Sequence, residues 1–126
     1  MNAILKSVAA AALAMGASLG AITGASAEGE RFVFVSHAPD SDTWWNTIKN
    51  ALTVASGQME VEVEYRNPPT GDLADMARII EQAAATSPDG IITSIADFDV
   101  LMGPITSAVD RGIPVITVNS GTLEQS

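Results

Sequence analysis

Short polar side chains and two adjacent tryptophans follow the predicted strands of this chain, and their types suggest a binding site. The candidate residues are His37, Asp42, Trp44, Trp45, Ser94, Asp97, Asn119 and Ser120. An aromatic ring covers the C–H face of a sugar, while Asp, Asn and Ser side chains hydrogen-bond to hydroxyl groups. These residues therefore predict a site for a polyhydroxylated small molecule.

Several of these residues also have a structural alternative. Adjacent helix positions differ by about 100° in direction, so we expect one tryptophan to face the ligand and one to pack. We assign Trp45 to the ligand and Trp44 to the core. Asp97 and Asp99 are equally suited to capping a helix. His37 has no metal or triad partner in the sequence, which favours a structural role.

The sequence contains no catalytic motif. The absence of Cys excludes thiol catalysis, cysteine-ligated metals and disulfides. A single His without Cys leaves little for zinc or nucleophilic chemistry. The motifs of phosphate-binding loops, dinucleotide sites, zinc proteases and serine hydrolases are missing. An acid–base pair formed by Asp97 and Asp99 has no other support. We therefore expect no enzyme, no metal site and no cofactor.

The elements that must position these residues alternate between strand and helix. Residues 31–36 form a continuous apolar run, typical of a strand buried on both faces. The capping side chains of residues 40–42 open a helix that should stop at Gly57. Residues 59–66 alternate between apolar and charged side chains, which predicts an edge strand with one face in water.

The second half of the chain continues this alternation. A second amphipathic helix is expected from about Asp72, followed by a buried strand over residues 91–95. A third helix should hold Pro104 in its first turn, where a missing N–H costs nothing. Residues 113–118 form the fourth predicted strand.

Four strands joined by helical crossovers predict an α/β fold with a doubly wound parallel sheet. With residues 59–66 at the edge, the expected strand order is 2-1-3-4. Ligands of such sheets bind outside the carboxyl ends of the strands, where the crossovers leave on opposite faces. The candidate residues all lie in loops at those carboxyl ends.

The first 27 residues have the pattern of a secretory signal peptide. Lys6 supplies a positive charge, an uncharged apolar run extends from Ser7 to about Gly24, and Ala25-Ser26-Ala27 fits a signal peptidase. A membrane anchor is the alternative, but the run is rich in Ala and Gly and cleavage is signalled at once. We expect cleavage after Ala27, a domain over residues 28–126 and no insertion in the membrane.

The part after Ala27 is strongly acidic. It contains all 15 acidic residues of the chain and five of its six basic ones. Such a surface repels phosphate groups, so neither nucleic acid nor an anionic bilayer is an expected partner.

Three segments carry motifs of a known family. Phe32-Val-Phe-Val-Ser36, followed by Asp42-Thr-Trp-Trp45, is similar to a strand and the D-P-F-W segment after it. Pro88-Asp-Gly-Ile-Ile92 and the run AVDRGIPVITVN from Ala108 to Asn119 match two further motifs. Over residues 31–122 the chain resembles the type I periplasmic solute-binding proteins, the sugar receptors of ABC importers.

The resemblance implies a periplasmic N-terminal lobe of a two-lobed receptor, here stopping before the hinge and second lobe. It implies ligand contacts from Asp42, Trp44 and Trp45, from Ala96–Asp97 and from Asn119–Ser120. Asn119–Ser120 stands where the family often has Asp-Arg, so the resemblance does not indicate which substrate is bound. The implied ligand is a sugar or polyol, and the implied partner is an ABC permease of the inner membrane.

Two other functions stay open. A protein of this fold can present a ligand, such as a quorum signal, to a membrane sensor, and a truncated fragment can lack function. A neighbouring permease gene would favour import, whereas a neighbouring sensor-kinase gene would favour signalling. The sequence names neither the solute nor the oligomeric state.

In a bacterium with an outer membrane, we expect the exported chain to begin at Glu28. Signal peptidase requires small residues at positions 25 and 27, so Ala27→Phe should leave the precursor uncleaved, whereas Glu28→Gln should be processed normally. N-terminal sequencing of the periplasmic and cytoplasmic fractions measures this. An intact Met1 in cytoplasmic wild-type protein would contradict the prediction.

Overall fold

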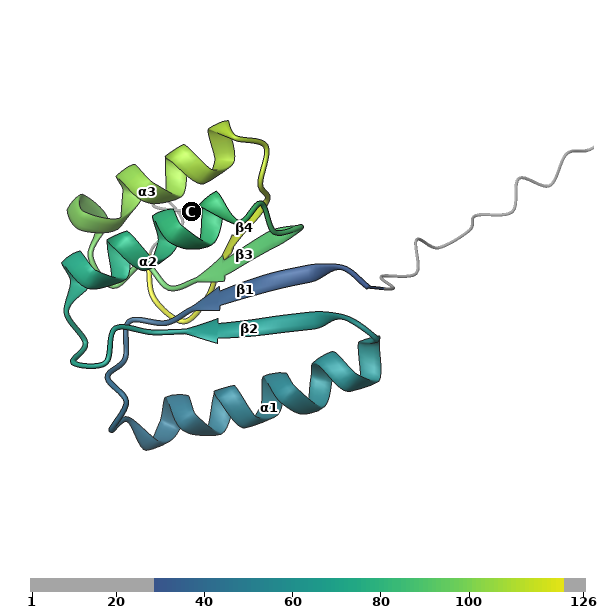
Figure 1. Ribbon diagram of the computed structural model, residues 1–126. Coiled ribbons are helices and arrows are strands. Elements are labelled where there is room, and N and C mark those ends of the chain that lie inside the picture. The colour runs from purple at the N-terminus through teal and green to yellow at the C-terminus, as the bar shows by residue number, and fades with distance from the viewer. Residues whose placement is uncertain (1–28, 122–126) are drawn as a thin grey trace, which may run out of the picture.

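The computed structural model describes residues 29–121, arranged as a parallel sheet between two helical layers (Figure 1). The predicted signal peptide and residues 122–126 lie outside the described residues. In chain order the elements are β1 (Arg31–Val35), α1 (Thr43–Met59), β2 (Glu62–Arg66), α2 (Leu73–Ala85), β3 (Gly90–Thr93), α3 (Phe98–Asp110) and β4 (Val115–Thr117).

The four strands run parallel in the order β2-β1-β3-β4, which confirms the predicted sheet. The register places Phe34 of β1 between Tyr65 of β2 and Ile92 of β3. The chain passes from β1 to β2 through α1 on one face, and returns through α2 and α3 on the other (Figure 1). The direction of winding therefore changes between β1 and β3, as expected.

Each face of the sheet has its own apolar core. The larger core lies beneath α2 and α3, and its most buried members are Val33, Val35, Met76, Ile80, Ile91 and Leu101. The smaller core lies beneath α1 and is built around Phe34, Ala38 and Trp45. Alternate side chains of β1 supply both cores, because successive residues of a strand point to opposite faces.

An aspartate begins each of the three helices. A carboxylate oxygen of Asp42, Asp72 and Asp97 accepts the backbone N–H three residues ahead, at 3.0, 2.8 and 3.0 Å respectively. Each cap satisfies an N–H that the helix leaves unpaired and contributes about 1 kcal/mol. These side chains thus determine where the helices start.

The boundary between α1 and β2 differs from the prediction. α1 continues through Gly57 to Met59, so the strand predicted over residues 59–66 begins only at Glu62. Glu60 caps the end of α1 with a left-handed φ of 57°, and its N–H donates to the Ser56 carbonyl. A glycine inside a helix costs only about 1 kcal/mol relative to alanine, which does not suffice to stop α1.

Pro104 lies inside α3, and its predicted place in the first turn is wrong. The helix already begins at Phe98, because Asp97 caps it. Pro104 therefore leaves the carbonyl of Val100 without its helical donor, which costs about 3 kcal/mol in a helix interior. Its ring is buried, and that apolar contact offsets part of the cost.

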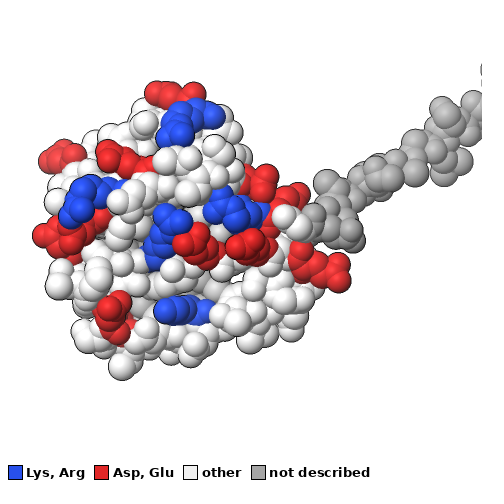
Figure 2. Space-filling model, in the orientation of Figure 1, with Lys and Arg blue, Asp and Glu red and all other residues white. Residues whose placement is uncertain are grey.

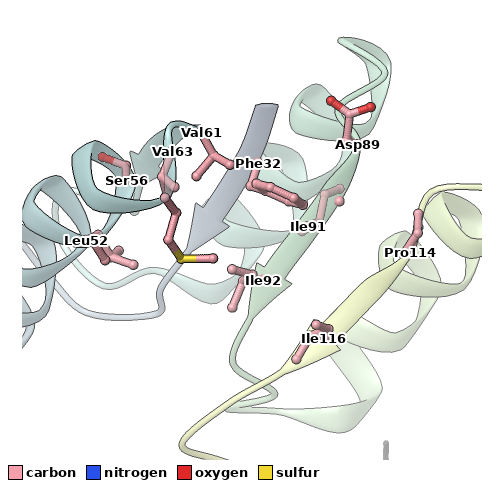
Figure 3. Close-up of a pocket in the computed structure, with 13 residues that line it drawn as sticks. Phe32, Leu52, Ser56, Val61, Val63, Asp89, Ile91, Ile92, Pro114 and Ile116 are labelled. Atoms are coloured by element: carbon pink, nitrogen blue, oxygen red, sulfur yellow. The ribbon is translucent and has the colours of Figure 1, made fainter. Parts of the chain in front are cut away.

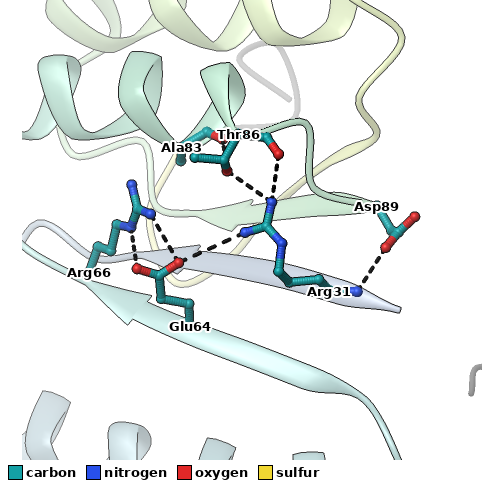
Figure 4. Close-up of polar contacts among 6 residues, drawn as sticks. All are labelled: Arg31, Glu64, Arg66, Ala83, Thr86 and Asp89. Carbon is teal, nitrogen blue, oxygen red and sulfur yellow. Dashed lines mark hydrogen bonds and ion pairs between the residues drawn. The ribbon is translucent and has the colours of Figure 1, made fainter. Parts of the chain in front are cut away.

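A polar cluster fastens the amino end of β1 to its neighbours (Figure 4). The Arg31 guanidinium donates to the carbonyl and hydroxyl oxygens of Thr86, after α2, at 2.8 and 2.9 Å. It also lies 3.9 Å from the Glu64 carboxylate on β2. This one side chain connects β1 with elements on both sides.

Hydrogen bonds from Arg66, at 2.8 and 2.9 Å, lower the pKa of the Glu64 carboxyl. A lowered pKa in the folded state means that folding favours the charged carboxylate. The contribution to stability is therefore present above the ordinary pKa of glutamate and is lost as the pH falls through the lowered value. Glu64 is substantially exposed, so the contribution is small.

Charged side chains of both signs are interspersed on the face shown in Figure 2. The basic side chains lie among acidic ones and form no continuous patch on that face. A phosphate backbone would therefore find no extended basic surface there.

The α1 face of the sheet is only partly covered. Beside α1, an apolar groove of about 450 Å³ opens over β3 and β4 (Figure 3). Its walls include Phe32, Leu52, Met59, Val63, Ile92 and Ile116. Ile116 is 62% exposed and belongs to the edge strand β4, which has no charged residue. An uncharged edge beside an apolar groove favours association.

We expect the chain to self-associate through the β4 edge, with a second copy covering the exposed Ile116. Ile116→Lys should shift the protein toward the monomer, because a charged side chain on an edge strand opposes pairing. Light scattering over a concentration series measures the mass. The matched control is Val109→Lys, an exposed position on α3, which covers the opposite face of the sheet from the groove. A wild-type protein that stays monomeric throughout, or an equal effect of both variants, would contradict the prediction.

Candidate functional site

The carboxyl ends of β1, β3 and β4 bring most of the predicted site residues to one edge of the sheet. Backbone hydrogen bonds hold the loop after β4 beside the loop after β3. The N–H of Val118 donates to the Thr93 carbonyl at 2.8 Å, and the N–H of Ile95 donates to the Ser120 carbonyl at 3.3 Å. The larger apolar groove lies toward the other end of these strands and is a separate feature.

His37 and Ser94 meet across the point where the sheet changes its winding direction. Nδ1 of His37 lies 2.8 Å from the Ser94 hydroxyl, although the residues are 57 positions apart in sequence. Ser94 is completely buried. Among residues 29–121 no carboxylate is hydrogen-bonded to His37, so the acidic member of a hydrolase triad is missing from the described site. The contact joins the loops after β1 and β3.

Tyr65, which the sequence analysis did not single out, extends this polar edge to β2. Its hydroxyl lies 2.6 Å from the Ser36 hydroxyl, and its ring stacks on Phe34 with centroids 5.7 Å apart. Burial raises the pKa of Tyr65, so the phenol keeps its proton at neutral pH. The alternating pattern of β2 is the signal for this residue, because it puts Tyr65 on the same face as Val63.

Asn67 was also missed, and it shapes the loop that carries Asp40 and Asp42. Its side-chain amide donates to the Ala38 carbonyl and to the Asp40 carboxylate, both at 2.9 Å. The two prolines after Asn67 mark a turn but do not indicate which loop its side chain reaches. Only the fold places this amide beside the β1 loop.

The two tryptophans have opposite environments, and the expected core position of Trp44 is wrong. Trp45 is 5% exposed and packs beside Phe34, with ring centroids 6.0 Å apart, whereas Trp44 is 53% exposed. The cap at Asp42 fixes where α1 starts, and this turns position 45 toward the sheet. The indoles meet edge to face, at 4.9 Å and 89°.

A shallow hollow of about 320 Å³ lies where these tryptophans face the loop after β4. It is lined by Phe34, Trp44, Trp45, Ile48, Val118 and Asn119. Asn119 has a left-handed φ of 68°. The Ser120 hydroxyl oxygen is buried without a hydrogen-bond partner among the described residues. The lining of the hollow is mainly aromatic and aliphatic, and Asn119 is its polar member among the described residues.

Asp42 and Asp97 both cap helices, so the capping role considered for Asp97 is present. Asp42 stands next to the tryptophans, at the start of α1. Asp97 is exposed at the start of α3 and bonds to Val100 of the same helix. A cap occupies one carboxylate oxygen, and the other oxygen is not needed for it.

Two further observations concern the described residues alone. No cluster of three or more His, Cys, Asp or Glu side chains there is arranged to hold a metal ion. Within residues 29–121, no helix has the length and apolar character needed to cross a membrane.

The sequence and the fold match one family. The sequence pattern of the periplasmic binding protein domain matches residues 32–126. The chain therefore belongs to the periplasmic binding protein family, as its motifs predicted. No curated protein is significantly similar to it.

Solved structures agree with this assignment. A carbohydrate transporter from Acidothermus cellulolyticus 11B, in complex with myo-inositol, is 31% identical with a TM-score of 0.71. A periplasmic ribose ABC transporter from Conexibacter woesei is 26% identical with a TM-score of 0.72. They match 77% and 79% of this chain, but this chain covers only 33% of each of theirs.

A third similar structure is that of a mutant XylFII–LytSN complex. It is 28% identical with a TM-score of 0.67, and the match covers 75% of this chain and 34% of that one. The chain thus spans about a third of the length of these solved relatives, and the relatives named for transport are carbohydrate or sugar ABC transporters rather than enzymes.

The tryptophans should differ sharply in their effect on stability. Trp45→Ala removes a buried ring from the smaller core and should cost about 3–5 kcal/mol. Trp44→Ala removes a half-exposed ring and should cost no more than about 1 kcal/mol. Urea denaturation monitored by far-ultraviolet circular dichroism measures both losses. Equal destabilisation, or a larger loss for Trp44→Ala, would contradict this assignment.

Proposed function

We propose that this chain is the N-terminal lobe of an exported receptor that captures a sugar or polyol for an ABC transporter. The observation that carries the proposal is the half-exposed Trp44 beside Asn119 in a hollow at the carboxyl edge of the sheet. Membership of the periplasmic binding protein family and the carbohydrate-related structures support it.

The site supplies the two kinds of contact that a sugar ring needs. The exposed indole of Trp44 offers an apolar face for the C–H groups of the ring. The second oxygen of Asp42 and the amide of Asn119 offer partners for ligand hydroxyls. Ser120 is a further candidate, although its hydroxyl, which has no partner among the described residues, is buried here and would have to become accessible to a ligand. In this proposal His37, Ser94 and Trp45 shape the site. Asp97 contributes a carboxylate from the start of α3.

The proposed receptor has two lobes, of which residues 28–126 form most of one. The solved relatives are about three times as long as the matched region, which leaves room for a second lobe. Closure of two lobes would remove water from the ligand's hydrogen bonds. A single lobe leaves part of the ligand in solvent, so we expect weak binding by this chain alone.

The proposed location is the periplasm, reached through the signal peptide that ends at Ala27, with an ABC permease of the inner membrane as the receiving partner. The alternative is a receptor that presents its ligand to a membrane sensor. The similarity to XylFII, which was solved in complex with a second protein, LytSN, supports retaining this alternative role. Gene neighbourhood separates the two roles, since permease and ATPase genes accompany import and a sensor-kinase gene accompanies signalling.

A titration by heteronuclear NMR tests the ligand site. Increasing myo-inositol, ribose, glucose and galactose should shift the Trp44 indole and Asn119 amide signals, with dissociation constants of roughly a millimolar or weaker. An absence of shifts with every sugar up to saturating concentrations would reject a sugar site in this lobe. A micromolar constant would show that the lobe suffices as a receptor and would reject the two-lobe requirement.

Trp44→Ala should weaken the binding of the best sugar roughly two- to tenfold, because an aromatic contact contributes about 0.5–1.5 kcal/mol beyond its buried area. Val54→Ala is the matched control, since Val54 is an exposed apolar residue farther along α1. The same titration gives both constants. Unchanged affinity in Trp44→Ala, with shifts persisting at Asn119, would contradict the stacking role.

A further inference from the structure

We propose that Ser94 and His37 are positioning residues that set the orientation of Trp44 through Trp45. The inference rests on the proposed function, in which Trp44 carries the ligand. It differs from direct ligand contact by His37, because each step in it is a contact within the protein. Three successive contacts link the buried end of β3 to the exposed indole.

The first contact anchors the imidazole. Ser94 has no exposed surface and directly follows β3, so its hydroxyl is held by the sheet. Nδ1 of His37 lies 2.8 Å from that hydroxyl. Either atom can be the donor, depending on the tautomer, and both arrangements fix the ring in the same place. The hydrogen bond therefore restricts a ring that sits in a loop.

The second contact passes this restriction to Trp45. The His37 ring meets the Trp45 indole at 5.4 Å and 81°, and Phe34 meets it at 6.0 Å and 59°. Phe34 belongs to the sheet, whereas His37 belongs to the loop after β1. The indole of Trp45 thus has a neighbour from the sheet and a neighbour from the loop, and loss of either leaves space in which it can turn.

The third contact reaches the ligand platform. Trp44 meets Trp45 edge to face at 4.9 Å and 89°, a favourable geometry for aromatic rings. More than half of the Trp44 surface is exposed, and Trp45 is the one aromatic ring that it contacts among the described residues. The orientation of Trp44 then follows that of Trp45. A platform that is already oriented binds more tightly, because less side-chain freedom is lost on binding.

The test measures the tryptophan pair without any ligand. Two indoles in contact give an exciton couplet in the far-ultraviolet circular dichroism spectrum, whose amplitude depends on their relative orientation. Ser94→Ala, in the full chain, should reduce this couplet and increase acrylamide quenching of the fluorescence of Trp45. His37→Phe retains a ring but loses the hydrogen bond, and should have the same effect. The double variant should be no worse than either single one, because both remove one interaction.

Thr93→Val is the matched control. It removes a fully buried hydroxyl from the neighbouring position, where Thr93 donates to the Val35 carbonyl and not to His37. It should preserve the couplet even if it lowers thermal stability. An unchanged couplet in both Ser94→Ala and His37→Phe would overturn the proposal. An equal loss in Thr93→Val would also overturn it, because general loosening would then explain the change.

Ligand affinity supplies the functional readout for the sugar that wild-type chain binds best. Ser94→Ala should weaken it roughly two- to tenfold, comparable to removal of the stacking contact, and Thr93→Val should not. Because the couplet and the quenching are measured without ligand, they test the contacts from Ser94 through His37 and Trp45 to Trp44 even if no sugar binds. A lost couplet with unchanged affinity would overturn the link between orientation and binding.

Discussion

The pairing of β1 with β3 is the constraint on which the rest of this structure depends. Chain connections leave this central pair in opposite directions, so α1 covers one face while α2 and α3 cover the other. The loops after the two strands consequently separate and leave a crevice at their carboxyl ends. The His37–Ser94 hydrogen bond lies at this divide and joins the loops across it. The position of the candidate site is therefore set by the strand order and its connections rather than by any one side chain.

One of the aspartates that start the helices also stands beside the candidate site. Asp42 begins α1 and thereby sets the direction in which Trp44 and Trp45 project. A carboxylate at a helix N-terminus is stabilised by the helix dipole and by backbone N–H groups. Such a group is fixed before a ligand arrives, which makes it a well-oriented acceptor for a hydroxyl. Helix capping and ligand binding are compatible uses of one side chain here.

The two faces of the sheet are covered to different extents. Two helices enclose the larger core, whereas α1 alone leaves an apolar groove over β3 and β4. The groove is larger than the hollow at Trp44 and lies toward the amino ends of the strands, whereas the hollow lies at their carboxyl ends. Both linings are mainly apolar, and the proposed function assigns the ligand to the hollow because that end of a doubly wound sheet is where ligands bind.

The parallel α/β fold, the strand order and the edge at which the candidate residues gather could all be predicted from the sequence. Continuous apolar runs, alternation in β2 and capping aspartates suffice for these features because each depends on local pattern. Three features could not be predicted in this way: the burial of Trp45, the hydrogen bond between Tyr65 and Ser36, and the hydrogen bond between His37 and Ser94. The end of α1 at Met59 and the position of Pro104 inside α3 also differ from the prediction. These outcomes depend on helix rotation and on contacts between residues far apart in the chain, which local spacing does not encode.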